Sequence, residues 1–263
     1  MNELARPSDA AISVNLPLEV DTPSLRPFEP SGADQWPKTP QSGLSLGHSN
    51  GRPIYPAASL SRSVQLVVKR GVDIVLASAA LLLLAPFLLT CSVLIRLSGP
   101  GSIFFRQTRI GRDGRQFSIL KFRTMRADAC DPTGISQTTI ADSRVTPLGR
   151  FMRSKSIDEL PQLWNVLIGD MSLVGPRPHV PGMLAAGIDY EALVPYYSVR
   201  WAMRPGLTGW AQVNGLRGPT TDAGRAIARV DHDIAYIQNF SLLLDLRCIV
   251  VTAWREIFGA YGS

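Results

Sequence analysis

Cysteine, histidine and lysine are all scarce among the 263 residues of this sequence. The three cysteines, at positions 91, 130 and 248, have neither the paired spacing nor the partnering histidines of a zinc site or a disulfide framework. The three histidines are dispersed, and we assign none of them a catalytic role. Only four of the 27 basic residues are lysine, so arginine dominates, and its planar fork of donors suits phosphate groups. A coding bias toward arginine would explain the same count equally well.

The sequence as given also lacks the pattern of a secretory leader, because its one long apolar run begins beyond residue 70 and no basic start leads into it. We therefore expect the folded part to face a reducing cytoplasm. Apolar residues make up 45% of the chain and charged residues 18%, which fits one soluble domain with a single membrane segment rather than a polytopic transporter. No recognition-helix pattern accompanies the net charge of +6, so we expect no nucleic-acid partner.

Three segments are expected along the chain. Residues 1–60 contain nine of the 20 prolines and no sustained hydrophobic period, which predicts a disordered, Pro-rich N-terminal segment. Residues 61–98 hold the apolar run and, over 63–69, a stretch that predicts a short interfacial helix leading into it. Residues 99–263 are expected to form one domain with its own core.

The apolar run covers residues 74–95, which are 22 residues without a formal charge. As a straight helix it would be about 33 Å long, enough to cross the hydrocarbon core of a bilayer. Its two flanks are both basic: three basic residues lie between 62 and 70, and eight lie between 96 and 126 against the single acid Asp113. Positive flanks tend to stay on the cytoplasmic side, and here both flanks favour the same side.

Pro86, near the middle of the run, allows a sharp bend because it removes one backbone hydrogen bond and its ring clashes with the preceding turn. One interpretation is a re-entrant helix that enters the membrane, turns at Ala85 and Pro86, and leaves by the same face. The alternative is a kinked helix that crosses once, since many membrane spans carry a proline. Charge and proline alone leave the two interpretations even.

Beyond the run, the pattern predicts a hairpin of strands 103–105 and 117–122 around a turn at 111–114. Helices are expected at 149–155, 161–168, 188–199, 221–239 and 242–258. The last is amphipathic, and we expect it to pack on the core rather than lie on the bilayer. The predicted fold is α/β: a small, mainly helical domain with a short β-hairpin, anchored by one proline-broken re-entrant membrane helix.

Asp158 and Glu159 are adjacent carboxylates at the expected start of a helix. If Ser156 is the N-cap, Glu159 completes a capping box; if the cap is Leu160, Pro161 takes the favoured first helical position. Capping alone would explain the pair. The functional interpretation is a nucleophile beside a metal ligand, because a carboxylate can attack phosphorus and a neighbouring carboxylate can hold Mg²⁺.

Candidate phosphate-binding cations lie in the loops and strands that follow the apolar run. They are Arg109, Arg112, Lys121, Arg123, Arg177 and Arg204. On a strand, Lys121 and Arg123 would point to the same face, and the prolines on both sides of Arg177 restrict its backbone. Any one of them alone is more simply a surface cation, and the clustering beside a membrane segment also fits attraction to anionic lipids.

Five separated motifs occur in order along the chain. They are KRGVD at 69–73, KFRTM at 121–125, DELPQLWNVL at 158–167, GDMSLVGPRP at 169–178 and RPGLTGWAQVNG at 204–215. Together they closely resemble the bacterial sugar transferase family, the small monotopic phosphoglycosyl transferases, from about residue 64 to residue 258. Asp233 and Tyr236 resemble a further patch of that family, although Ala235 stands where an aromatic residue is common.

The resemblance implies an enzyme of the bacterial inner (cytoplasmic) membrane with its catalytic domain on the cytoplasmic face. Such enzymes move a hexose 1-phosphate from a UDP-sugar to undecaprenyl phosphate, release UMP, and so initiate exopolysaccharide or related glycan synthesis. By the same resemblance, Asp158 is the nucleophile and Glu159 holds Mg²⁺. Arg177 falls in the family's proline-framed arginine motif, and Arg204 falls in its nucleotide-sugar region. The family's membrane element is a helix bent at a proline, which favours the re-entrant interpretation around Ala85 and Pro86.

Two other functions are weighed against this one. A non-catalytic membrane scaffold of a polysaccharide assembly complex would not need the intact carboxylate pair, and a transferase that passes only the sugar would release UDP. Membrane lipid is an expected partner in every case. The sequence does not determine which sugar is moved; galactose and glucose are typical of the family. It also does not determine whether the protein forms a homo-oligomer or binds polysaccharide assembly proteins.

Overall fold

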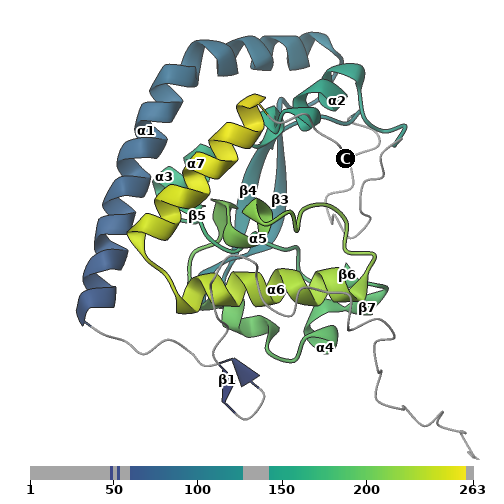
Figure 1. Ribbon diagram of the computed structural model, residues 1–263. Helices are drawn as coiled ribbons and strands as arrows, with labels where there is room; N and C mark the ends of the chain where they lie inside the picture. Colours follow the sequence, from purple (N-terminus) through teal and green to yellow (C-terminus); the bar gives the residue numbers. More distant parts are fainter. Residues whose placement is uncertain (1–47, 50–51, 54–59, 127–141, 259–263) are drawn as a thin grey trace, which may run out of the picture. The chain divides into compact units, whose positions relative to one another are not determined.

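The computed structural model describes residues 48–49, 52–53, 60–126 and 142–258. The predicted disorder of residues 1–60 therefore falls almost wholly outside the described residues and stays a prediction. Within that segment, β1 (His48–Ser49) pairs with β2 (Arg52–Pro53) in an antiparallel ladder. The described domain is mainly helical with short strand pairs, as expected (Figure 1).

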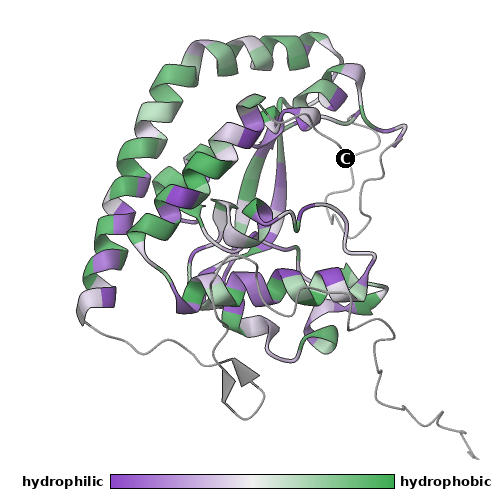
Figure 2. Cartoon of the chain, viewed as in Figure 1, coloured by the Kyte–Doolittle hydropathy of each residue, from purple (hydrophilic) through white to green (hydrophobic). Residues whose placement is uncertain are grey.

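The apolar run lies in one continuous helix, α1 (Leu60–Leu97), which carries Pro86 in its interior. The interfacial helix expected over 63–69 is therefore not separate but forms the first turns of α1. Figure 1 shows α1 bending into two arms, and Figure 2 shows apolar residues along both. By length and composition, α1 could cross a membrane. Only 11% of its most apolar 18-residue window is buried.

Buried polar contacts fasten the first arm of α1 to the domain. Lys69 Nζ lies 2.6 Å from the Asp245 carboxylate and donates to the Val174 carbonyl at 2.9 Å. Tyr236 donates its hydroxyl to the same carboxylate at 2.6 Å. One turn further along, Asp73 accepts the backbone N–H of Leu173 at 3.0 Å. Because a buried charge is costly unless it is paired, these contacts hold α1 in one register.

The other end of α1 is fastened by apolar packing of Ile95 on Phe122 and Met152 and by the side chain of Arg123. Arg123, which is buried, donates to the carbonyls of Ile95, Gly99 and Pro100 at 3.1, 2.9 and 2.5 Å. Arg123 lies just after β4 (Gln116–Phe122), so both ends of α1 are bound to the same domain.

The predicted hairpin is confirmed and is longer on its first side than expected. β3 (Phe104–Ile110) pairs antiparallel with β4, from Phe104 opposite Phe122 to Ile110 opposite Gln116. The turn between them contains Asp113 and Gly114 at positive φ, which glycine and aspartate tolerate better than most residues.

Four of the five expected helices are confirmed within a few residues. They are α2 (Pro147–Ser154), α3 (Gln162–Ile168), α6 (Ala223–Gln238) and α7 (Leu242–Phe258). Gly169 ends α3 at φ +99°, the left-handed conformation that favours glycine after a helix.

The helix expected over 188–199 is wrong. The chain forms β6 (Leu184–Ala185) paired with β7 (Ile188–Asp189), one turn of helix α4 (Tyr190–Leu193), and the 3₁₀ segment η5 (Tyr197–Ala202). Pro195 explains the break, because the residue before a proline is pushed out of the helical region and Val194 is extended here.

A short parallel pair brings two of the sequence motifs together. β5 (Ser172–Val174) pairs with β8 (Gly206–Thr208), and the short helix α5 (Trp210–Val213) follows. A Cβ on Gly206 would come within 2.1 Å of the Gly175 nitrogen. The backbone just after β5 therefore approaches the first residue of β8 too closely for a side chain to fit between them.

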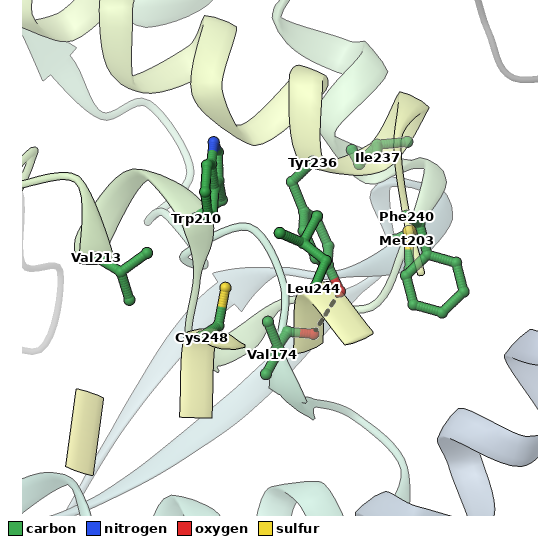
Figure 3. Close-up of a cluster of buried hydrophobic side chains, with 9 residues drawn as sticks. All are labelled: Val174, Met203, Trp210, Val213, Tyr236, Ile237, Phe240, Leu244 and Cys248. Carbon is green, nitrogen blue, oxygen red and sulfur yellow. Dashed lines mark hydrogen bonds between the residues drawn. The ribbon is translucent and has the colours of Figure 1, made fainter. Parts of the chain in front are cut away.

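The largest buried cluster lies where α5, α6 and α7 meet β5 (Figure 3). It contains Val174, Met203, Trp210, Val213, Tyr236, Ile237, Phe240, Leu244 and Cys248. The expected core packing of α7 is thus confirmed for one side of that helix. Its other side is apolar and exposed, at Leu243, Leu246, Val250, Trp254 and Phe258.

Asp245→Asn should lower the free energy of unfolding by about 3–5 kcal/mol, because it leaves Lys69 charged and buried without its counter-ion. Asp113→Asn is the matched control, since Asp113 pairs with Arg112 at 3.4 Å while both side chains are at least half exposed, a pair worth less than about 1 kcal/mol. Denaturant unfolding in detergent measures both. Equal losses from the two variants would contradict the anchoring role.

Candidate active site

A large cavity, of about 950 Å³, opens beside the hairpin and under α7. Among the described residues its lining includes three acids, Asp158, Glu159 and Glu256. It includes nine basic residues: Arg109, Lys121, Arg123, Arg144, Arg153, Lys155, Arg177, Arg217 and Arg229. Such an excess of basic over acidic side chains favours an anionic ligand with more than one charge.

Asp158 and Glu159 lie on a 3₁₀ turn, η4 (Ile157–Glu159), directly before α3. Neither predicted cap is correct. Ser156 adopts a left-handed conformation at φ +50° and caps nothing; its hydroxyl donates to Glu256 at 3.4 Å instead. Pro161 is itself the N-cap of α3 rather than its first residue. The carboxylates are therefore presented by a strained turn and not by a capping box.

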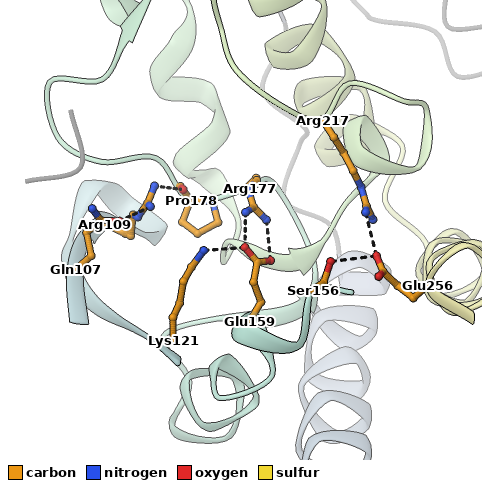
Figure 4. Close-up of polar contacts among 9 residues, drawn as sticks. All are labelled: Gln107, Arg109, Lys121, Ser156, Glu159, Arg177, Pro178, Arg217 and Glu256. Carbon is orange, nitrogen blue, oxygen red and sulfur yellow. Dashed lines mark hydrogen bonds and ion pairs between the residues drawn. The ribbon is translucent and has the colours of Figure 1, made fainter. Parts of the chain in front are cut away.

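Glu159 is held by two cations (Figure 4). Lys121 Nζ lies 2.7 Å from Oε1, and Arg177 donates to both oxygens, at 2.6 and 3.2 Å. Burial of the carboxyl raises its pKa, but the charges of Arg177 and Lys121 outweigh burial and hold the pKa of Glu159 well below its ordinary value. Glu159 is therefore a fixed, ionised group across the physiological range.

Asp158 is the contrasting member of the pair. It is buried at the cavity wall, and burial raises its pKa above the ordinary value, with the charge of Lys121 opposing that shift and the charge of Glu159 adding to it. Among the residues that the structure describes, none donates a hydrogen bond to this carboxylate. An incompletely solvated carboxylate facing a cation-rich cavity is suited to act as a nucleophile.

The structure brings together four of the six predicted phosphate-binding cations. Arg109, Lys121, Arg123 and Arg177 line the cavity with the carboxylates. The guanidinium of Arg123 donates hydrogen bonds to the carbonyls at the end of α1. Arg109 donates to the Pro178 carbonyl at 3.2 Å and to Gln107, and burial lowers its pKa to about 10 (Figure 4).

Arg112 and Arg204 lie outside the lining of this cavity. Arg112 is half exposed in the hairpin turn, and Arg204 donates to the Gly169 carbonyl at 2.9 Å. Their predicted phosphate contacts stay predictions.

Sequence reasoning missed the cations on the other side of the dyad. Arg153 lines the cavity and donates to Thr124 at 2.8 Å, and Arg217 pairs with Glu256 of α7 at 3.0 Å. The basic stretch that ends at Lys155, three residues before Asp158, was a usable signal for the first of these. Nothing local marks Arg217, which is more than 50 residues away.

Within the described residues, no group of three acidic, histidine or cysteine side chains could by itself hold a metal ion. Mg²⁺ is commonly held by one or two carboxylates completed by substrate phosphates. The adjacent Asp158 and Glu159 fit that mode, although a metal at Glu159 must share its oxygens with Lys121 and Arg177.

The chain is similar to several characterised bacterial proteins. It is 50% identical over 199 residues, which are 76% of this chain and 100% of the relative, to exopolysaccharide production protein PSS of Rhizobium leguminosarum bv. phaseoli. Two relatives carry the name UDP-glucose:undecaprenyl-phosphate glucose-1-phosphate transferase. The match is 42% identical for Escherichia coli K12 and 46% for Xanthomonas campestris pv. campestris, over 80% and 73% of this chain. The chain spans only 45% and 39% of the length of those two relatives.

The sequence model of one family, described as bacterial sugar transferase, matches residues 64–259. The matched region contains all but the first four residues of α1, the hairpin, the Asp158–Glu159 turn and all the cations that line the cavity. The chain therefore belongs to the bacterial sugar transferase family.

Proposed function

We propose that this protein transfers a hexose 1-phosphate from a UDP-sugar to undecaprenyl phosphate and releases UMP, as the initiating step of exopolysaccharide or related glycan synthesis. The observation that carries the proposal is a buried carboxylate, Asp158, facing a cavity with nine basic residues and three acids. The names of the relatives supply the class of donor and acceptor, and they place glucose first among the sugars to be tested.

The reaction proceeds in two displacements at one phosphorus. An oxygen of Asp158 bonds to the phosphorus that carries the sugar, the bond to the bridging oxygen breaks, and UMP leaves with that electron pair. An oxygen of the prenyl phosphate then bonds to the same phosphorus, and the Asp158 carboxylate leaves unchanged. Lys121 and Arg177 stabilise the charge that develops on the phosphoryl oxygens. Glu159 would help to hold Mg²⁺, which screens phosphate charge when bound.

The fastening of α1 supports a re-entrant helix. A helix that crossed the bilayer would put its two ends on opposite sides, yet Lys69 and Arg123 bind both ends to the same domain. We propose that the bend lies at Ala85 and Pro86, and that the domain sits on the cytoplasmic face of the inner membrane. Leu76 and Ala80 of α1 line the cavity, which gives a lipid acceptor a direct path to Asp158.

The competing functions make different demands on the site. A silent scaffold has no need for a carboxylate whose pKa is raised beside one whose pKa is depressed. A transferase that moves only the sugar would leave both phosphates on the nucleotide.

Asp158→Asn should lower transfer of labelled sugar phosphate to lipid by at least about 10³-fold, because the amide cannot form the acyl phosphate. The assay contains UDP-glucose, undecaprenyl phosphate and Mg²⁺, and it quantifies lipid product and released nucleotide. Asp113→Asn, in the exposed hairpin turn, is the control and should keep full activity.

Two outcomes would overturn this proposal. Wild-type protein that releases UDP instead of UMP would be a sugar-only transferase. An Asp158→Asn variant with normal turnover, or the absence of any phospho-sugar adduct in the intact mass of wild-type protein given donor without acceptor, would remove the nucleophile.

Cysteines introduced at Ser63 and Ser102, one exposed position near each end of α1, should react with an impermeant maleimide from the cytoplasmic side only. Right-side-out and inside-out vesicles of a variant without the native cysteines provide the measurement. Reaction of the two positions from opposite sides would mean that α1 crosses the membrane.

A further inference from the structure

The loop that carries Arg177 is held by its carbonyls. All four consecutive carbonyls of residues 176–179 accept hydrogen bonds, each from a different donor. Pro176 accepts from Gly206 N at 2.9 Å, Arg177 from the Arg200 guanidinium at 2.8 Å, Pro178 from the Arg109 guanidinium at 3.2 Å, and His179 from Ile110 N at 3.0 Å.

The sequence of this loop explains why carbonyls are used. Pro176 and Pro178 have no backbone N–H, so neither neighbour of Arg177 can donate a backbone hydrogen bond that would hold the loop in place. An outside donor must supply the restraint, and at Arg177 itself that donor is the side chain of Arg200.

Arg200 is itself rigidly placed. It lies in η5, its side chain is 3% exposed, and it meets the Asp233 carboxylate of α6 at 2.7 and 2.9 Å, where the carboxylate is 2% exposed. The Tyr197 ring lies 4.9 Å from the guanidinium carbon, and His179 Nδ1 lies 3.1 Å from one of its nitrogens. Arg200 Nε and Nη2 both contact Asp233 Oδ2, and Nη2 also donates to the Arg177 carbonyl, so the buried ion pair fixes the direction of that donor.

Arg177 has no such packing of its own. Its side chain is 38% exposed, and its described side-chain partner is Glu159. Its direction therefore depends on where the backbone places it. Asp233, Arg200 and the Arg177 carbonyl form a line of buried contacts that ends at the cavity.

We propose that Arg200, fixed by Asp233, is a positioning residue that aims the Arg177 guanidinium at Glu159 and at a phosphate of the bound nucleotide. The inference rests on the proposed function in that Arg177 is taken to contact the donor. Neither Arg200 nor Asp233 lines the cavity, so their effect on the donor passes through Arg177.

Arg200→Lys tests the proposal, because lysine keeps the charge beside Asp233 but cannot also fork to the Arg177 carbonyl. We expect the dissociation constant of UDP, measured by calorimetry, to rise about 10-fold, and kcat/KM for UDP-glucose to fall by at least that factor, because Arg177 contacts phosphate in the ground state and in the transition state. Arg225→Lys is the matched control: an exposed arginine that also donates to a carbonyl, that of Gly215 at 3.5 Å.

A double-mutant cycle separates positioning from general damage. In an Arg177→Met background, Arg200→Lys should change UDP affinity less than twofold, because the charged group being aimed is gone. If Arg200→Lys fails to fold, the pair Arg200→Leu with Asp233→Leu replaces it, since apolar replacement of a whole buried ion pair is often neutral for stability.

The outcomes divide cleanly. A 10-fold loss that vanishes in the Arg177→Met background supports the proposal. The same loss persisting there, no loss in the single variant, or no UDP binding by wild-type protein overturns it. Wild-type protein that binds UDP but transfers nothing refutes the proposed function alone, and the binding cycle still decides the role of Arg200.

Discussion

The attachment of both ends of α1 to one domain is the constraint on which the rest of this structure depends. At one end a buried lysine, an aspartate and a tyrosine form a closed polar group, and at the other Arg123 takes three carbonyls. The middle of α1 packs on the domain through Ala77 and Leu81, while Leu82 and Leu83 on its outer side are exposed. The cavity lies against the first arm, so a water-soluble anion and an apolar chain can approach the same carboxylate.

Electrostatics assigns different tasks to two neighbouring carboxylates. The charge of Glu159 is balanced by two cations, which lower its pKa and keep it ionised. Asp158 is buried, and the charge of Lys121 does not fully offset the rise that burial causes in its pKa. The difference arises from direction rather than from sequence position, because the 3₁₀ turn points consecutive side chains to different neighbours. Ser156, in a left-handed conformation, precedes this 3₁₀ turn, and its side chain does not cap it.

Much of the fold follows from local signals in the sequence. The Gly-containing turn marks the hairpin, Gly169 marks the end of α3, and the apolar period of 242–258 marks α7. The helix expected over 188–199 failed because Pro195 outweighs an apolar pattern. In the site, Arg112 and Arg204 lie outside the lining of the cavity, whereas Arg153 and Arg217, which were not predicted, line it. Contacts such as Arg200 with Asp233 join residues 33 apart on different elements, and single-sequence periodicity carries no information about them.

The polar fastening of α1 also determines how this protein can be made soluble. Deleting the helix would strip Asp245 of its counter-ion, leave Tyr236 beside an unpaired carboxylate, and remove Leu76 and Ala80 from the wall of the cavity. The helix α1 therefore forms part of the cavity wall and supplies the counter-ion of a buried carboxylate. A water-soluble form would need α1 retained and its outward leucines, such as Leu82 and Leu83, exchanged for polar residues.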